Sequence, residues 1–419
     1  MPELRIDGAR LCHSLEQLGA VGSYEDEGTG LMGVNRLALT NDDRAGRQLV
    51  KRWFEEAGLT VRVDAIGNTY GRRAGREDDA APVMSGSHID SVPTGGRFDG
   101  ALGVLGALEV VRTLNGAGVT TRRPIEIGFF TDEEGSRFGT DMLGSATACG
   151  RIELDAALAL RDTNEISVGQ ELSRIGFQGS ARPRLDPPHA FVECHIEQGP
   201  ILDARGMELG VVTGVQAIHW RELTIRGKSA HAGTTPMELR RDAGRAIAHI
   251  QVALDEMITS GRYGAAMRAT IGRITLRPNL VNVVPGHASC TIDLRNPSDE
   301  AMARACEELK ARLDGIAQNL GVEITGRETA RTASVSFDER VRTLIAERMV
   351  AAGIKHEDIL SGAGHDAQEF AAICPAAMIF VPGQFDGISH NPREYSTPEA
   401  CTAGIQILLD TLVTLANED

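Results

Sequence analysis

Acidic and imidazole side chains stand at the ends of several short apolar segments of this sequence. The segments read PVMSGSHIDSV, GGRFDGALGV, IEIGFFTDEEG, FVECHIEQG and GISHNP, and the side chains belong to His88, Asp90, Asp99, Glu133, Glu134, His195 and His390. Three segments have the uniformly apolar pattern of buried strands that stop where the polar residue begins. In an open α/β sheet, ligands bind in the crevice outside the carboxyl ends of the strands. Imidazoles and carboxylates gathered there suit zinc or a similar divalent cation, so the pattern predicts a metallohydrolase.

The spacing of the first three residues suggests how a metal would be held. His88 and Asp90 are two apart on an extended segment and therefore share a face. Asp90 could then accept the second ring N–H of His88 and orient the imidazole. Asp99 lies between Gly96 and Gly100, in a loop that leads into a helix. A carboxylate there could bridge two cations about 3.5 to 4 Å apart.

Glu133 and Glu134 are adjacent acids, which a regular strand would point in opposite directions. Gly135 permits a turn that brings both side chains inward. One could then ligate metal while the other takes a proton from the attacking water, and the residues alone leave open which does which. The alternative is a solvated surface turn that also includes Asp132. For a structure without a metal site, all five strand or loop ends would have to carry only solvated acids or ordinary hydrogen-bonded histidines.

Strand-like and helix-like segments alternate through the first half of the chain. Helical patterns cover residues 44–58, 101–114 and 154–172, and strand patterns cover 60–70, 82–90, 124–131 and 190–195. Such an alternation predicts an α/β fold with a mainly parallel sheet and helices on its faces. We expect this part to be the catalytic domain of the metallohydrolase.

The pattern changes after Leu209 and returns to the α/β type near Phe337. The intervening residues contain a long extended run, helical patterns at 236–258 and 298–320, a β-rich stretch at 265–295 and a strand at 322–325. They predict an inserted α+β module, an antiparallel sheet with two helices. The predicted domains are therefore 1–211 plus 328–419, which hold the candidate metal ligands, and the inserted 212–327.

Composition narrows the function classes. The chain has 419 residues, a formal net charge of −15 and only 4% aromatic residues, so binding to nucleic acid is not expected. The N-terminal segment lacks the apolar stretch of a secretory signal, and no run is long enough to span a membrane. Seven cysteines without a CxxC motif fit a reducing compartment. We expect a cytoplasmic protein without a membrane partner.

Seven segments, in this order, closely resemble the amidase, hydantoinase and carbamoylase family: GSHIDSVPTGGRFDGALGV, FTDEEGSRFG, HIEQGPILD, SAHAGTTPM, PNLVNVVPG, SGAGHDA and GISHNP. The family includes N-carbamoyl-L-amino-acid hydrolases, allantoate amidohydrolases and β-ureidopropionases, within the two-metal aminoacylase and carboxypeptidase superfamily. The resemblance implies two divalent cations per subunit (Zn²⁺, or Mn²⁺, Co²⁺ or Ni²⁺). Their implied ligands are His88, Asp99, Glu134, His195 and His390.

The resemblance also implies roles for these residues. Asp99 would bridge the cations and Glu133 would be the general base. His195 stands where peptidase relatives generally carry an acid, which favours the amidase branch.

Five further residues are candidates for binding a small ureido substrate with a carboxylate: Gln198, His231, Asn282, Arg295 and Gly364. Arg295 could grip a carboxylate bidentately, or pair with Asp293 on the same strand face. Asn282 could be a turn residue, His231 an ordinary loop histidine, and Gln198 alone is a weak signal. The resemblance implies that the positions of all five face the substrate, with His231 stabilising the oxyanion. His365 and Asp366 would lie behind the ligands.

The resemblance implies hydrolysis of N-carbamoyl-L-amino acids to amino acid, carbon dioxide and ammonia. Allantoate amidohydrolase and β-ureidopropionase are the alternatives that share all the machinery. An exopeptidase or aminoacylase is a more remote alternative, which His195 and Gln198 disfavour. A metal-stabilised binding protein would be expected to lack the base Glu133. The resemblance further implies a homodimer joined through the inserted dimerisation or lid module, with His231 reaching the other subunit's metal site.

Overall fold

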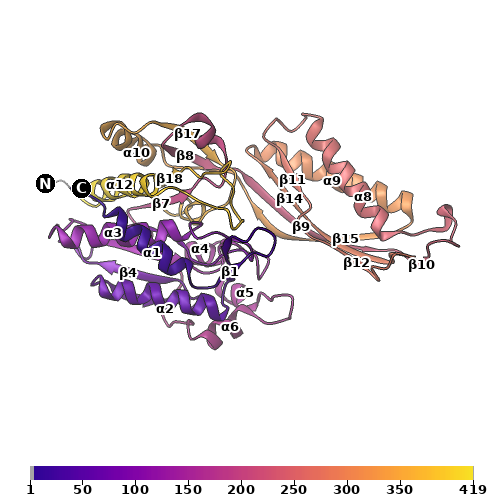
Figure 1. The fold of residues 1–419 in the computed structure, drawn as a ribbon, viewed down its shortest axis with the longest axis horizontal. Coiled ribbons are helices and arrows are strands. Elements are labelled where there is room, and N and C mark those ends of the chain that lie inside the picture. Colours follow the sequence, from indigo (N-terminus) through magenta and orange to yellow (C-terminus); the bar gives the residue numbers. More distant parts are fainter. Residues whose placement is uncertain (1–3, 419) are drawn as a thin grey trace. The chain divides into compact units, whose positions relative to one another are not determined.

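The chain of the computed structural model, which describes residues 4–418, divides into two compact units. One unit comprises Met1–Gly214 and Ser336–Asp419, and the other is the inserted Val215–Val335 (Figure 1). None of the helices within residues 4–418 is both long and apolar enough to cross a membrane.

The first unit is built around one mixed sheet. Before the insertion its elements are α1 (Gly8–Gly19), β1 (Ser23–Glu25), β2 (Met32–Val34), α2 (Asn41–Glu56), β3 (Thr60–Val63), β4 (Thr69–Arg73), β5 (Val83–His88), α3 (Ala101–Gly116), β6 (Ile125–Phe130), α4 (Leu143–Cys149), α5 (Leu154–Ala159), α6 (Val168–Ile175), β7 (Ala190–Ile196), α7 (Ile201–Arg205) and β8 (Leu209–Val215). After it come β16 (Val335–Ser336), α10 (Glu339–Ala351), β17 (His356–Ser361), α11 (Asp366–Phe370), β18 (Ala376–Val381) and α12 (Pro398–Leu415).

The centre of this sheet is parallel. Among the described residues it has nine strands in the order β16-β8-β18-β7-β5-β6-β4-β3, with β17 also paired to β8. β18, β7, β5 and β6 run parallel to one another, and every residue in them is buried. Strands covered on both faces read as continuous apolar runs, which is why the sequence pattern was uniform there. The predicted α/β fold with a mainly parallel sheet is confirmed.

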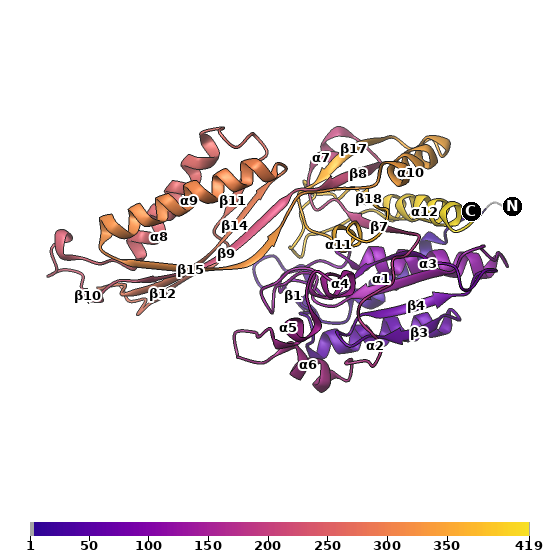
Figure 2. The same ribbon diagram turned by 180° about the vertical axis from the view of Figure 1, so that it is seen from behind.

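Alternate residues of β7 face the two helical layers. The Cys194 sulfur lies 3.3 Å from the place where a Cβ on Gly404 of α12 would be. On the other face the ring of Phe191 stacks on Phe370 of α11, with centroids 3.9 Å apart. α11 therefore lies on the same face of the sheet as His195. Figure 2 shows α11 next to β7 and β18.

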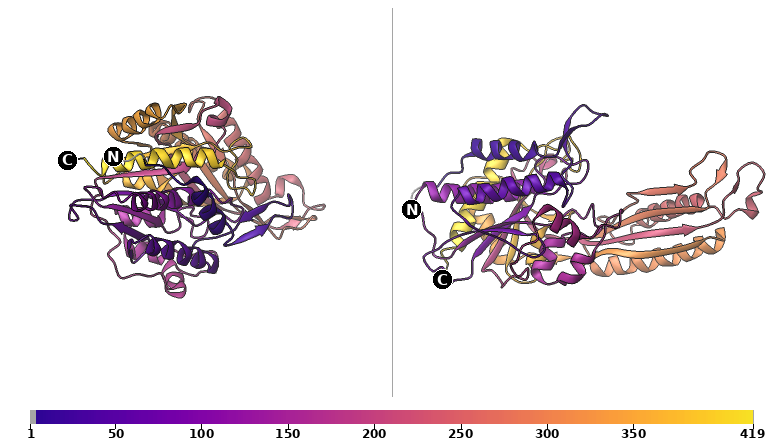
Figure 3. Two further views of the ribbon diagram at one scale, coloured as in Figure 1. Left: turned by 60° about the vertical axis from the view of Figure 1, so that its left-hand side comes forward. Right: turned by 90° about the horizontal axis from the view of Figure 1, so that it is seen from below.

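The second unit is an α+β module with its own core. Its elements are β9 (Ala217–Arg226), β10 (Ala230–His231), the 3₁₀ helix η1 (Met237–Leu239), α8 (Ala243–Thr259), β11 (Arg268–Thr270), β12 (Ile274–Arg277), β13 (Val283–Val284), β14 (His287–Asn296), α9 (Asp299–Leu320) and β15 (Glu323–Thr332). β11, β14, β9 and β15 form an antiparallel sheet in that order, with β12 also paired to β14. Helices α8 and α9 pack against it (Figure 3), as the expected antiparallel sheet with two helices requires.

Two predicted segments are interrupted in the structure. The run 60–70 is two antiparallel strands, because the Asp64 carboxylate accepts the N–H groups of Ile66 and Asn68 and turns the chain. The helical pattern 154–172 is two helices. Between them Asp162 accepts the N–H groups of Asn164 and Ile166, and Ser167 begins α6 with a capping box.

Candidate metal centre

The first group of candidate ligands gathers around one oxygen of Asp99. β5 and β7 are parallel neighbours, so His88 and His195 lie at the same carboxyl edge of the sheet. Asp99 reaches them from the loop that leads into α3. Its Oδ1 lies 3.6 Å from His88 Nε2 and 3.2 Å from His195 Nε2. All three side chains are buried, at 1%, 5% and 1% exposure for His88, Asp99 and His195.

The second group gathers around the other oxygen of the same carboxylate. Asp99 Oδ2 lies 3.4 Å from His390 Nε2, which is also 3.3 Å from Glu134 Oε2. His390 has a left-handed backbone, with φ 55°, and its side chain is half exposed. The structure thus brings together all five residues that the family resemblance implied as ligands, in two groups that share Asp99.

The spacing of these donors fits two bridged divalent cations. Two ligands of a tetrahedral zinc ion, each about 2.1 Å from it, lie about 3.4 Å apart. The observed nitrogen-to-oxygen distances of 3.2 to 3.6 Å scatter about that value. Each oxygen of Asp99 serves one group, as a bridging carboxylate does.

Backbone carbonyls fix the histidine tautomers in the form that metal binding requires. His88 Nδ1 lies 3.0 Å from the carbonyl oxygen of Asp90, and His195 Nδ1 lies 2.8 Å from that of Ile196. A carbonyl can only accept, so in the neutral ring Nδ1 carries the proton and Nε2 keeps its lone pair. In His195 this lone pair accepts the N–H of Gly100 at 3.2 Å. The Asp90 carboxylate was expected to make the bond to His88, but its Oδ1 is 3.9 Å away.

The Asp90 carboxylate instead supports the turn that presents the two acids. It accepts the N–H groups of Glu133 and Glu134, each at 3.4 Å. Gly135 has φ 62°, and a Cβ there would lie 2.8 Å from the backbone of Thr140, so the turn needs glycine. Glu133 Oε2 reaches to 3.4 Å from His88 Nε2. Both acids therefore point inward, as the sequence predicted.

Burial and close charges shift the pKa values in opposite directions across the site. Burial raises the pKa of Glu133 well above its ordinary value, although His88 opposes this. Burial acts to raise the pKa of Asp99 too, but hydrogen bonds from His195, His390 and His88 hold that pKa well below its usual range. Partial burial would lower the pKa of His390, but Glu134 and Asp99 raise it to about 11. Of the two carboxylates, Glu133 therefore holds a proton far more readily than Asp99.

Two residues that the sequence analysis missed hold Asp99 in place. Buried Glu394 accepts the N–H groups of Phe98 and Asp99 at 3.0 and 3.1 Å. Ser389 donates to Asp99 Oδ2 at 3.0 Å and is 2.7 Å from Glu394 Oε2. Burial and the nearby Asp99 raise the pKa of Glu394 to about 7.

The sequence carried one usable signal for this arrangement. Glu394 follows His390 by four residues, and a Cβ on Gly96 would lie 2.4 Å from the Glu394 side chain. The acid four residues after a ligand histidine was visible in the sequence, whereas its contact with Gly96 is visible only in the structure.

A third group of metal-type donors lies under the first. Glu193, His195 and His365 are close together and buried, and the rings of His195 and His365 are 4.5 Å apart. Glu193 accepts from Ser87 Oγ at 2.6 Å and from the N–H of Ala367 at 2.8 Å. These bonds use both carboxylate oxygens of Glu193, so we interpret it as support for the ligand strands. Glu193 and His195 are two apart on β7, which makes them neighbours on one face.

Asp366, the other residue expected behind the ligands, is buried at the start of α11. Its Oδ1 accepts from Ser145 Oγ at 2.5 Å. Burial raises the pKa of Asp366 well above its ordinary value.

The candidate substrate residues are divided between the two units. Gln198 and Gly364 belong to the first unit, and His231, Asn282 and Arg295 belong to the second. Gln198 Nε2 donates to Asp99 Oδ2 at 2.8 Å, so this amide is at the metal centre.

His231 lies on a two-stranded ribbon of β10 and β13. The N–H groups of Gly233 and Thr234 donate to its Nδ1 at 3.1 and 3.3 Å, so in the neutral ring the proton is on Nε2. The backbone carbonyl oxygen of Asn282 accepts the N–H of Ala232 at 2.9 Å. His231 is thus presented as an exposed N–H donor.

Arg295 makes the contact that the sequence analysis named as its structural alternative. Its Nη2 lies 2.9 Å from Asp293 Oδ2 and its Nε 3.1 Å from Asp293 Oδ1. Both side chains are partly exposed, at 24% for Arg295 and 30% for Asp293. The guanidinium is therefore held on the sheet surface by a neighbouring acid.

Comparisons with known proteins identify the family. Residues 84–414 match the model of peptidase family M20/M25/M40. An N-carbamoyl-L-amino-acid amidohydrolase of Rhizobium meliloti is 38% identical, over 98% of this chain and 97% of that protein. An allantoate amidohydrolase of Bacillus subtilis is 34% identical, over 96% of each chain. The crystal structure of a hydantoinase/carbamoylase family amidase from Burkholderia vietnamiensis superposes with a TM-score of 0.94, at 41% identity over 99% of this chain and 98% of that one. The chain belongs to peptidase family M20/M25/M40, among its hydantoinase/carbamoylase amidases.

Proposed function

We propose that this protein is a metal-dependent amidohydrolase that cleaves the carbamoyl C–N bond of N-carbamoyl-L-amino acids. The products are the amino acid, carbon dioxide and ammonia. The observation that carries the proposal is the pair of ligand groups sharing Asp99, in a chain 38% identical to an N-carbamoyl-L-amino-acid amidohydrolase. Its seven cysteines are all unpaired thiols, which supports a cytoplasmic location.

Two divalent cations would complete the site. His88, Asp99 and His195 would hold one, and Asp99, Glu134 and His390 the other. Nitrogen and oxygen donors without thiolate suit Zn²⁺, Mn²⁺, Co²⁺ or Ni²⁺. Such ions, when bound, polarise the substrate carbonyl and acidify a water.

Glu133 would move the proton in the reaction. Its carboxylate takes a proton from the attacking water, and the resulting acid gives that proton to the leaving nitrogen. The raised pKa of Glu133 suits this second task, since the protonated form persists in the buried site. Asp90 acts through the backbone, because it accepts the N–H groups that set the direction of Glu133 and Glu134.

The remaining candidates would recognise the substrate. His231 would donate its Nε2–H to the developing oxyanion. Arg295 would bind the substrate carboxylate, with Asp293 holding its fork in place until substrate arrives. Gln198 would offer its amide beside Asp99, and Asn282 and Gly364 would line the bound substrate.

We further propose that residues 1–211 and 328–419 are the catalytic domain, and 212–327 a dimerisation and lid domain. Apolar side chains near the His231 ribbon are strongly exposed, at 56% for Met237, 67% for Leu239, 59% for Leu280 and 103% for Val281. Exposed apolar groups of this kind favour burial against a partner. They support a homodimer in which His231 serves the other subunit's metal site.

Allantoate hydrolysis is the second candidate. It is favoured by the 34% identity to an allantoate amidohydrolase over 96% of each chain. Allantoate also joins a ureido group to a carboxylate, so the same groups could bind it. β-Ureidopropionase activity is a third possibility within the family.

Steady-state assays on metal-loaded protein test the proposal. The substrates are N-carbamoyl-L-amino acids, allantoate, N-carbamoyl-β-alanine and a dipeptide, each with zinc-, manganese- and cobalt-loaded enzyme. We expect the highest kcat/KM with an N-carbamoyl-L-amino acid and none with the dipeptide. A higher kcat/KM with allantoate would replace the proposed substrate, and efficient dipeptide cleavage would contradict the reaction class. Glu133→Gln protein serves as the background control.

A further inference from the structure

A cavity of the first unit lies beside the metal centre and shares Glu394 with it. It has a volume of about 640 Å³, within the usual range for sites that bind small molecules. Its walls come from α1 and the β1–β2 hairpin, from residues 96–97, and from two stretches near His390, 384–385 and 392–395. None of the five candidate metal ligands lines it. The cavity is therefore distinct from the metal centre.

Glu394 forms a wall between the cavity and the metal centre. It lines the cavity, yet its carboxylate accepts the N–H groups of Phe98 and Asp99. Arg97, which also lines the cavity, precedes these two residues directly. A ligand in the cavity would thus contact the same short loop that positions the shared ligand Asp99.

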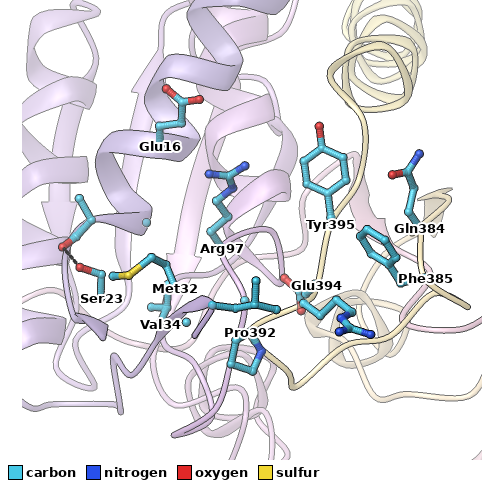
Figure 4. Close-up of a pocket in the computed structure, with 16 residues that line it drawn as sticks. Glu16, Ser23, Met32, Val34, Arg97, Gln384, Phe385, Pro392, Glu394 and Tyr395 are labelled. Carbon is cyan, nitrogen blue, oxygen red and sulfur yellow. Dashed lines mark hydrogen bonds between the residues drawn. The ribbon is translucent and has the colours of Figure 1, made fainter. Parts of the chain in front are cut away.

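The cavity contains opposite charges that do not pair. Within residues 4–418 neither Arg97 nor Arg393 forms an ion pair; their guanidinium groups lie instead over the rings of Phe98 and Phe385, at 5.2 and 5.9 Å. Glu16, on α1, also forms no ion pair with a described residue. In Figure 4 the Arg97 guanidinium lies between the side chains of Glu16 and Tyr395.

The rest of the lining includes a large apolar surface. Met32 and Phe385 are 61% and 54% exposed, although both are large hydrophobic side chains. Tyr395 packs edge-on against Phe98, with ring centroids 5.7 Å apart, and so offers a fixed aromatic surface. A ligand that covered these groups would remove apolar area from water.

We propose that this cavity binds a free L-amino acid with an apolar side chain. The α-carboxylate pairs with the guanidinium fork of Arg97, and the ammonium group pairs with Glu16. The side chain lies against Met32, Phe385 and Tyr395. A zwitterion satisfies the charges of Arg97 and Glu16 at once, which a simple anion or an N-carbamoyl amino acid does not.

A free L-amino acid is also a product of the proposed reaction. Only this connection between the cavity and the reaction rests on the proposed function. The cavity would then sense the amino acid that the enzyme releases, through the loop shared by Arg97, Asp99 and Glu394. The recognition itself follows from the lining residues and stands whichever ureido substrate is cleaved.

Equilibrium dialysis with radiolabelled L-leucine tests the proposal. The protein is metal-loaded Glu133→Gln enzyme, with and without saturating N-carbamoyl-L-leucine to occupy the metal centre. We expect one saturable leucine per subunit that the carbamoyl compound does not displace. Absence of saturable binding, or complete displacement by N-carbamoyl-L-leucine, would overturn the proposal. The proposed function is tested separately by hydrolysis assays on the unmodified enzyme, so the two can fail independently.

Charge substitutions locate the binding. Arg97→Gln and Glu16→Gln should each raise the leucine dissociation constant about 10-fold or more, because each removes a charge-assisted bond. Arg44→Gln and Glu27→Gln make the same charge changes at exposed positions outside the cavity and should leave binding unchanged. Isocaproate, which lacks the ammonium group, should bind more weakly than leucine to the unmodified protein. The Glu16→Gln variant should bind isocaproate and leucine equally well. Binding that survives both cavity substitutions would place the leucine elsewhere and reject the site.

Discussion

The buried carboxylate of Glu394 accepts the backbone N–H of Asp99 at 3.1 Å, so an acid outside the ligand set holds the shared ligand in place. Glu394→Ala should leave the backbone N–H groups of Phe98 and Asp99 without their acceptor. Loss of such support typically costs about 10- to 100-fold in metal affinity or activity. We expect that range for metal retention, measured by elemental analysis after dialysis.

The conservative variant separates positioning from folding. Glu394→Gln keeps one oxygen acceptor and should recover most of the metal content that Glu394→Ala loses. Glu399→Ala, an exposed acid on α12, is the control. If both Glu394 variants retained two cations as tightly as the unmodified protein, the support role would be wrong.

Glu133→Gln should keep both cations and bind substrate, but lose turnover. The amide cannot accept the proton of the attacking water, and general-base catalysis typically contributes about 10² to 10⁴ in rate. The measurement is kcat alongside metal content, with Glu134→Gln as the matched variant expected to lose metal. Substantial turnover by Glu133→Gln would require exchanging the roles of these two acids.

Arg295→Lys should raise KM about 10-fold or more with little change in kcat. Lysine keeps the charge but lacks the planar fork that matches a carboxylate. Asp293→Asn tests the alternative, since it removes only the ion pair seen in the structure. Because that pair is partly exposed, its loss should change stability by about 1 kcal/mol or less. Unchanged KM in Arg295→Lys would leave the ion pair as the only role of Arg295.

Removal of metal with a chelator should abolish activity and lower the unfolding temperature. Ligands that bind only the folded state stabilise it by mass action. Activity and unfolding temperature should both return on adding zinc, manganese or cobalt. A chelated, metal-free protein with full activity would contradict the metal centre.

Acid should destabilise the second unit through His219. This residue of β9 is buried against α9, with Nδ1 2.7 Å from Cys306 Sγ. Burial lowers its pKa below the ordinary value of 6.5, although Glu328 opposes the shift. Its contribution to stability is therefore complete above pH 6.5 and is lost as the pH falls through the lowered pKa.

His219→Gln should flatten this dependence. The measurement is urea unfolding at several pH values below neutrality, followed by tryptophan fluorescence. His249→Gln, at an exposed position on α8, should leave the dependence unchanged. Equal pH dependence in all three proteins would exclude His219 as its source.

The five ligand candidates could be predicted because each is a distinctive residue type next to a distinctive apolar segment. His88 and His195 end parallel strands that the apolar pattern revealed, and strand ends converge by topology. Glu394 was missed because its partners are backbone N–H groups, which no residue type displays. The contact of Asp90 was predicted wrongly for the same reason, because its backbone carbonyl and not its carboxylate orients His88.

The predicted strand and helix boundaries were wrong where a single polar side chain overrides a periodic pattern. Asp64 and Asp162 each turn the backbone through bonds to N–H groups two and four residues ahead. Periodicity averages over such single positions. The sheet and the two-helix module depended instead on long patterns, which one residue does not alter.

The carbonyl groups of Asp90 and Ile196 fix the tautomers of His88 and His195 with main-chain atoms alone. Every amino acid supplies a carbonyl, so replacing either neighbour's side chain leaves the proton on Nδ1. The tautomers of the two histidine ligands therefore do not depend on neighbouring side chains, whereas the position of Asp99 depends on the side chain of Glu394. A saturation-mutagenesis scan under selection for activity should accordingly tolerate apolar replacements of buried Ile196 and reject replacements of Glu394.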